Sequence, residues 1–245
     1  MPREKANSLE ATRSAAIPRP GEVFDPVARA LDWLGDKWTL VLVRHLLAGP
    51  QGFQQLRQRT GIAPRVLSNR LKQLIDASFV ETVDGEGARS RYGATQNGRD
   101  LEPIIAAVAR WYVHHAIAEL GLDMRRFDET SPISILESLP FLLREERAAD
   151  AQIVFEIRLE GAGGGVWAVT IDHGTCRVEA GFAARADVRY TADARIWCGV
   201  ALGLVDARDA AKRGLLTKEG GREAMDHYFH QVAHLGRGAR APEGT

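Results

Sequence analysis

The stretch KWTLVLVRHLLAGPQGFQQLRQRTGIAPRVLSNRLKQLI, residues 37–75, decides the fold of the first half of this chain. Its apolar residues recur at helical spacing in three runs, which are separated by Gly49-Pro50 and by a turn at Gly61. Pro64 is a favoured first residue of a helix, so the third run is expected to begin there. The pattern predicts three short helices, of which the last two form a helix-turn-helix.

The same stretch contains no Asp or Glu, although it carries seven Lys or Arg residues in a 245-residue chain of zero formal net charge. An acid-free segment of this kind predicts a surface for an anionic partner. Residues 1–125 hold 17 Lys and Arg against 14 Asp and Glu, and the rest of the chain carries the opposite excess. We therefore assign the anionic partner to the first half.

The third predicted helix has two unlike faces. A helical wheel centred on Leu71 places Leu67, Leu74 and Ile75 on one apolar stripe, and the side chains opposite it are polar apart from Val66. Arg can bond guanine through two hydrogen bonds, Asn and Gln can pair with adenine, and Lys and Ser can hold phosphates or base edges. The candidate DNA-binding residues of the helices are Arg57, Arg65, Ser68, Asn69, Arg70, Lys72 and Gln73. The alternative is an ordinary amphipathic helix with a solvated basic face.

A β-hairpin is predicted directly after these helices. Residues 79–83 and 89–95 have the composition of strands, and residues 84–87 that of a turn. Arg89 and Arg91 lie near its tip, where a wing can reach the DNA backbone or the minor groove. Both arginines therefore join the DNA-binding candidates.

This succession of motifs resembles the winged-helix transcription regulators of the HxlR type. The matching residues are DPVARALDWLGDKWTLVLVRHLLAGPQGFQQLRQRTGIAPRVLSNRLKQLIDASFVETV, followed by RSRYGATQNGRDL. The resemblance covers residues 24–118 and implies a dimeric protein that binds double-stranded DNA. Where that family usually has Cys-Pro, this chain has Asp25-Pro26, which excludes thiol sensing at that position.

Residues 97–120 are predicted as one long helix with apolar side chains on more than one face. A small winged domain cannot cover so much apolar surface, so the helix is expected to pack on its mate in a homodimer. The alternative is that it packs on the second half of the chain.

The second half predicts an α+β domain with an antiparallel sheet covered by helices. A helix from Ser131-Pro132 precedes strands over residues 151–160, 165–172, 175–181 and 187–191, and helices follow over residues 193–203, 206–213 and 218–235. The whole chain is thus predicted as an α+β protein, with a winged helix-turn-helix domain first.

This second domain resembles the sterol carrier protein type 2 domain over residues 131–236. The residues that carry the resemblance are GVWAVTIDHGTCRVEAG and ADVRYTADARIWCGVALGLVDARDAAKRGLLTKEGGREAMDHYFHQV. It implies an apolar tunnel for a hydrophobic small-molecule effector, with Phe155, Trp167, Phe182 and Trp197 as candidate ligand-binding residues. Ordinary core packing is the alternative for each of the four.

The expected organisation is a disordered arm (1–20), a winged domain (21–121), the second domain (131–236) and a disordered tail (237–245). No apolar run approaches the roughly 18 residues that span a membrane, and the first 20 residues lack the core of a signal peptide. We therefore expect a cytoplasmic protein that does not contact a membrane.

No catalytic residues, metal or cofactor are expected. Three histidines, His227, His230 and His234, share a face of the last predicted helix, but ligands spread over nearly two turns do not easily reach one ion. No Ser-His-Asp, paired-carboxylate or Cys-His arrangement lies on neighbouring elements. The predicted function is a dimeric DNA-binding regulator whose second domain senses a hydrophobic molecule. The alternative is a lipid carrier whose winged domain serves protein interaction.

Overall fold

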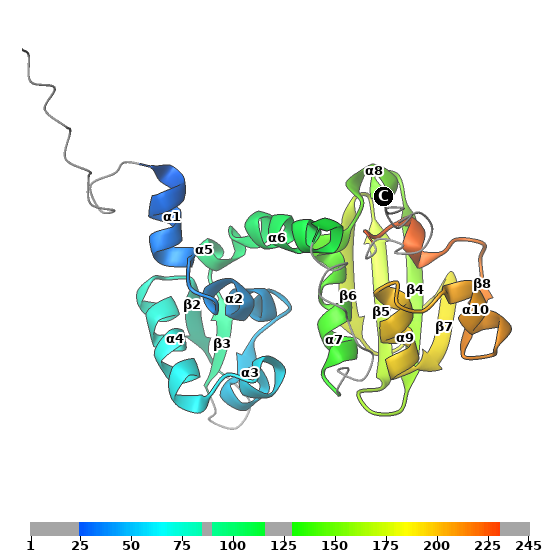
Figure 1. Ribbon diagram of the computed structural model, residues 1–245, viewed down its shortest axis with the longest axis horizontal. Coiled ribbons are helices and arrows are strands. Elements are labelled where there is room, and N and C mark those ends of the chain that lie inside the picture. The colour runs from blue at the N-terminus through cyan, green and yellow to red at the C-terminus, as the bar shows by residue number, and fades with distance from the viewer. Residues whose placement is uncertain (1–24, 85–89, 116–128, 231–245) are drawn as a thin grey trace, which may run out of the picture.

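The computed structural model of the chain describes residues 25–84, 90–115 and 129–230. It contains two units, and helix α6 (Glu102–His115) runs from the first toward the second (Figure 1). Within the described ranges, no helix has both the length and the apolar character needed to cross a membrane.

The first unit combines helices with a small antiparallel sheet. Its helices are α1 (Pro26–Leu34), α2 (Thr39–Leu47), α3 (Phe53–Thr60), α4 (Pro64–Asp76) and α5 (Gln96–Arg99). Its strands, in the order β1-β3-β2, are β1 (Gln51–Gly52), β2 (Val80–Val83) and β3 (Arg91–Ala94). The helices and the hairpin predicted from the sequence are confirmed, and the short strand β1 is an addition.

The helix predicted over residues 97–120 is wrong as a single element. Within the described residues it is divided between α5 and α6, because Pro103 lacks an N–H and fits only the first turn of a helix. The Leu101 N–H bonds back to the Gly98 carbonyl at 3.2 Å, which closes α5. Residues 116–120 lie outside the described residues.

The second unit is an α+β domain. Its helices are α7 (Ser131–Leu136), η3 (Leu139–Leu142), α8 (Glu145–Ala148), α9 (Ala194–Ala201), α10 (Ala207–Lys212) and η4 (Met225–His227). Its strands are β4 (Gln152–Glu160), β5 (Gly165–Asp172), β6 (Thr175–Ala180), β7 (Val188–Asp193) and β8 (Leu216–Gly220), in the order β6-β5-β4-β7-β8. Helices α7 and α9 lie over one face of this sheet (Figure 1).

The sheet is mixed, so the prediction of an antiparallel sheet is wrong at one pairing. After the β5–β6 hairpin the chain crosses to the far side of β4, and β7 pairs with β4 in parallel, with Phe155 opposite Val188. A parallel neighbour requires such a crossover, which the sequence pattern did not reveal.

The helix predicted over residues 218–235 is also wrong as far as residue 230, and residues 231–235, which include His234, lie outside the described residues. Strand β8 occupies the open edge of β7, with Lys218 opposite Tyr190, and Gly220 ends it at a φ of 94°. Pairing at a sheet edge and a glycine that disfavours a helix together override the apolar periodicity. His227 lies in η4 and His230 beyond it, so the shared histidine face does not form among the described residues.

The two units are in contact through η3. The Phe141 side chain is buried with Val43 of α2 and with Leu101 and Ile105 near the start of α6. Farther along α6, Val113 packs with residues of the second unit. One side of α6 therefore does pack on the second half of the chain, which was the alternative reading of this helix.

Candidate nucleic-acid interface

A tight turn sets α4 against α3. Gly61 adopts a φ of 65°, a left-handed conformation that costs glycine little, and its N–H bonds to the Arg57 carbonyl at 2.9 Å. Pro64 then begins α4, and Ala63 before it supplies no side-chain cap, as its identity dictates. Leu67, Leu71 and Leu74 are buried against α2 and α3, as the wheel predicts, but Ile75, the fourth predicted member of the apolar stripe, is 37% exposed.

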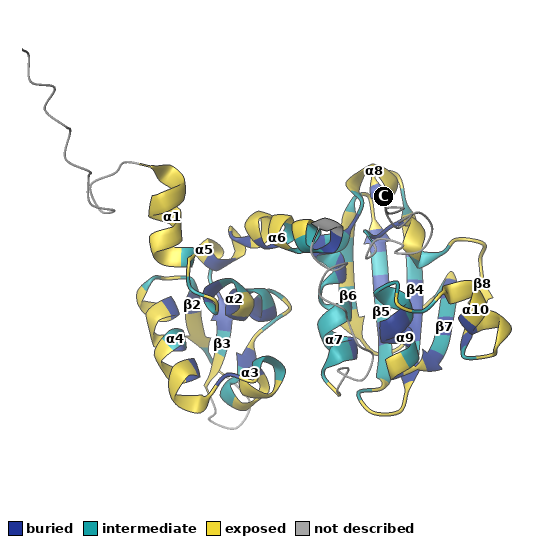
Figure 2. Ribbon diagram, viewed as in Figure 1, coloured by how far each residue is buried: buried dark blue, intermediate teal, exposed yellow. Residues whose placement is uncertain are grey.

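The opposite face of α4 is open to solvent (Figure 2). It lies on the side of the first unit that faces away from the second (Figure 1). The exposed residues of α4 are Pro64, Arg65, Val66, Ser68, Asn69, Lys72, Gln73, Ile75 and Asp76. The uncharged or cationic hydrogen-bonding groups among them suit the edges of base pairs in a major groove, and the one acid, Asp76, is the last residue of the helix.

Arg70, the remaining α4 candidate, is half-buried and turned toward the protein. Its Nη1 lies 3.6 Å from the Asp36 carboxylate and donates to Gln73 Oε1 at 2.8 Å. Burial raises the pKa of Asp36, but hydrogen bonds from Thr39 and the Trp38 N–H, together with the Arg70 charge, lower it overall. Asp36 therefore stays ionised and neutralises Arg70 at neutral pH.

Two more arginines of the acid-free segment contact one acid of the second unit. Arg59 of α3 and Arg44 of α2 both approach the carboxylate of Glu137. The four cations that remain make no ion pair among the described residues: Lys37, Arg57, Arg65 and Lys72. The basic surface is therefore smaller than the composition of the segment predicts.

Of the two wing candidates, Arg91 lies within the described residues. Arg91 begins β3 opposite Val83, is exposed, and donates a hydrogen bond from its guanidinium to the Pro50 carbonyl. Arg89 lies outside the described residues.

The predicted ligand-binding aromatics are divided between two faces of the sheet. Phe155, Trp167 and Trp197 are buried in the core of the second unit. Phe182 is 72% exposed, and the Arg158 guanidinium lies 5.3 Å from its ring centroid. Because side chains alternate along β4, Arg158 and Phe155 point to opposite faces.

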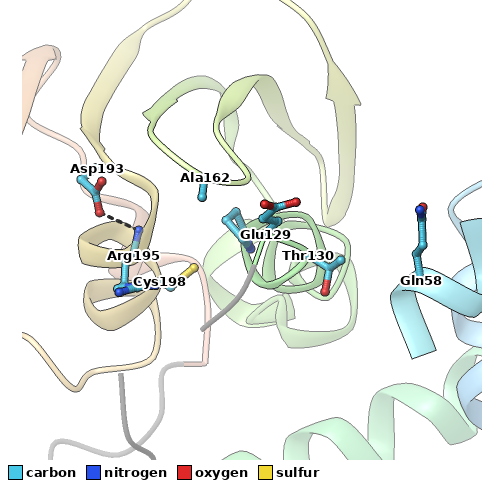
Figure 3. A pocket seen from close by; sticks show the side chains of 8 residues that line it. Gln58, Glu129, Thr130, Ala162, Asp193, Arg195 and Cys198 are labelled. Atoms are coloured by element: carbon cyan, nitrogen blue, oxygen red, sulfur yellow. Dashed lines mark hydrogen bonds between the residues drawn. The ribbon is translucent and has the colours of Figure 1, made fainter. Parts of the chain in front are cut away.

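A separate pocket of about 830 Å³ opens between α3 and the second unit (Figure 3). Its lining consists of Gln58, Glu129, Thr130, Pro132, Ala162, Asp193, Arg195 and Cys198. The four predicted aromatics are not among these residues. The pocket brings together side chains from distant segments, so no local sequence signal indicated it. Across the described ranges, no cluster of three or more His, Cys, Asp or Glu residues is placed to hold a metal.

Comparisons with known proteins match the first unit. Residues 33–119 match the HxlR-like helix-turn-helix family. An uncharacterized HTH-type transcriptional regulator of Mycobacterium tuberculosis H37Rv, Rv3095, is 34% identical over 89 residues, which are 36% of this chain and 56% of the relative. The likewise uncharacterized HTH-type regulator YvaP of Bacillus subtilis 168 is 31% identical over 86 residues, which are 34% of this chain and 80% of the relative.

Among solved structures, the redox regulator HypR in its reduced form is 29% identical, covers 38% of this chain and 96% of its own, and has a TM-score of 0.35. The chain spans little more than half of the length of the mycobacterial relative that it matches. The family match ends at residue 119, before the second unit begins.

Proposed function

Since the chain belongs to the HxlR-like helix-turn-helix family over residues 33–119, we propose that it is a transcription regulator that binds double-stranded DNA through α4. The observation that carries the proposal is the exposed polar face of α4, above all Arg65, Asn69 and Lys72. Arg and Asn are suited to read guanine and adenine, and Lys72 is suited to hold a phosphate. The contacts of Arg44, Arg59 and Arg70 with acids of the chain support this assignment, because they leave Arg65 and Lys72 as the cations of α4 that make no ion pair among the described residues.

A gel shift with the DNA upstream of the chain's own coding region tests this function. We expect binding that is tighter than to scrambled DNA of equal length and that weakens steeply with salt, because released counterions drive the phosphate contacts. Equal, salt-insensitive binding to both DNAs, or none, would contradict the proposal. The alternative of a carrier protein would then be favoured.

We also propose a phosphate or minor-groove contact for the wing. Arg91 is exposed and lies at the loop end of the paired strands, and its hydrogen bond to the Pro50 carbonyl fixes the position of its guanidinium. Arg91→Ala is expected to weaken binding to most DNA sequences and to lower the slope of log affinity against log salt by about one. An unchanged slope in this variant would remove Arg91 from the interface.

We propose that a second copy of the chain covers the apolar side chains exposed on α1 and α6. On α1, no residue is buried, and Val27, Leu31 and Trp33 are all more than half exposed. On α6, the exposed apolar residues are Ile104, Val108 and Trp111, at the spacing i, i+4, i+7 of one helical face. Exposed apolar faces on two helices of one small unit are typical of an interface, and a symmetric dimer buries both with itself.

For the second unit we propose a sensory role, in which a hydrophobic small molecule binds between α9 and the sheet. The buried aromatics Phe155, Trp167 and Trp197 support an apolar site there, although a ligand must displace part of the present packing. A long-chain fatty acid is expected to quench tryptophan fluorescence, to raise the Tm of the full chain, and to change DNA affinity several-fold. Binding with no change in DNA affinity would instead favour the carrier function. Absence of binding would leave the second unit without a sensory role for this class of ligand.

A further inference from the structure

The carboxylate of Glu137 is surrounded by side chains of the first unit. Glu137 follows the last residue of α7, and its Oε1 accepts a hydrogen bond from Arg59 Nη1 at 2.6 Å. Its Oε2 lies 3.7 Å from His45 Nδ1 and 3.9 Å from Arg44 Nη1. The Arg44 guanidinium also donates to the carbonyl of Ser134 and, at 2.6 Å, to Ser138 Oγ. Three side chains of α2 and α3 thus converge on the end of one helix of the second unit.

The cluster is largely shielded from water, and its charges depend on one another. The side chains of Glu137 and Arg44 are 12% and 14% exposed, and that of His45 is 6% exposed. Burial lowers the pKa of His45, so this ring is neutral at pH 7. Burial opposes ionisation of Glu137, but contact with His45 and the two arginines outweighs it and keeps the pKa low. One carboxylate therefore faces two shielded guanidinium groups, and the cluster retains one net positive charge.

The same contact holds η3 in place. Only Ser138 lies between Glu137 and Leu139, the start of η3, and Phe141 then packs between Val43 of α2 and Ile105 of α6. Helix α2 supports α4 through the core of the first unit, and α6 carries the face that we assign to the dimer. Glu137 is thus tied both to the helix-turn-helix and to the helix that sets the spacing of two copies.

We propose that Glu137 is a positioning residue, whose charge docks the second unit on α2 and α3 and thereby holds α4 in its DNA-binding arrangement. The role of the Glu137 charge in docking the second unit follows from the contacts above, whereas its effect on DNA binding by α4 rests on the proposed function.

The charge of Glu137 is expected to matter more than its shape. Replacement by Gln keeps the size of the side chain but leaves Arg44 and Arg59 shielded without an anion, and removal of one partner from such a cluster is strongly unfavourable. A second ion pair between the units, Arg110–Glu145 at 3.5 Å, offers a matched control, since the Glu145 side chain is 80% exposed. Exposed pairs contribute little, so Glu145→Gln removes the same charge from the same unit at little cost.

Amide hydrogen exchange of the full chain tests the docking. In Glu137→Gln we expect exchange in α7 and η3 to accelerate at least tenfold, with β4 and β5 unchanged as an internal measure of folding. Glu145→Gln is expected to behave as the unchanged chain. In the double variant Arg59→Gln with Glu137→Gln, exchange should return toward the original rate, because one uncompensated cation leaves together with the carboxylate. If β4 and β5 also lose protection, Glu137→Gln unfolds the second unit as a whole. The test is then Arg59→Gln alone, which breaks the 2.6 Å bond from the other side. Faster exchange in α7 of that variant supports the docking, and unchanged exchange contradicts it.

DNA affinity of the same variants tests the coupling. We expect Glu137→Gln to bind the chain's own upstream DNA at least fivefold more weakly than Glu145→Gln, since fewer molecules hold the competent arrangement. Exchange in α7 and η3 that matches the unchanged chain would overturn the docking. Faster exchange with unaltered DNA affinity would overturn the coupling. If the unchanged chain binds no DNA but Glu137→Gln still loosens α7, the docking is supported and the proposed function is the part that fails.

Discussion

Arg65→Ala is expected to lose about 1–3 kcal/mol of specific DNA binding, and Asn69→Ala a similar amount, because each side chain can form paired hydrogen bonds with one base. Both groups are exposed on α4, and neither is needed for the core that Leu67, Leu71 and Leu74 form on its other side. Folding stability should therefore change little, while the preference for a base at one position of the site is relaxed.

Arg208 supplies the matched control for this experiment. It is an exposed arginine at the second position of α10, as Arg65 is at the second position of α4, but it belongs to the second unit. Arg208→Ala should leave DNA affinity unchanged. The measurement is a pair of titrations, with the upstream DNA and with scrambled DNA. A loss of the same size on both DNAs would show that Arg65 contacts phosphates and does not read bases.

Trp111→Glu is expected to convert the proposed dimer into monomers. DNA affinity should then fall by roughly a hundredfold or more, because the second α4 helix of a dimer binds at the high effective concentration that the linkage provides. Trp111 is 60% exposed on α6 and lies on the same face as Val108 and Ile104. A buried glutamate at that interface would have no partner, and isolated carboxylates are costly to remove from water.

Sedimentation of the protein with and without this change measures the assembly directly. Phe182→Glu is the control, since it introduces the same charge in place of an aromatic residue that is 72% exposed in the second unit. It should leave the dimer intact. If the unaltered chain sediments as a monomer, or if Trp111→Glu remains a dimer, the proposed interface on α6 is wrong.

The parts of the fold that follow from local spacing could be predicted from the sequence. The faces of α4 depend only on which residues lie three and four positions apart, so Leu71 inside and Asn69 outside follow from a wheel. The turn at Gly61 and the start at Pro64 are equally local. The structure of the second unit was harder to predict from the sequence, because residues 216–220 form a strand only through pairing with the edge of β7.

The size of the basic surface depended on contacts that the sequence could not reveal. The acid-free segment suggested seven available cations, but Arg44 and Arg59 meet an acid that lies 78 positions beyond Arg59 in the chain. Arg70 meets Asp36, which stands just outside the segment. Composition counts charges, whereas availability depends on which of them pair after folding.

The burial of Phe141 has a consequence for how this chain can be divided. The family match ends at residue 119, yet the wall between α2 and α6 is completed by a phenylalanine that follows it by 22 positions. An N-terminal fragment ending there would leave Val43, Leu101 and Ile105 facing water, and loss of a buried phenylalanine typically costs about 3–5 kcal/mol. A different second unit joined to this first unit would need an apolar side chain that packs on Val43, Leu101 and Ile105 as Phe141 does. The part of the chain that completes the core of the first unit therefore extends beyond the range of the family match.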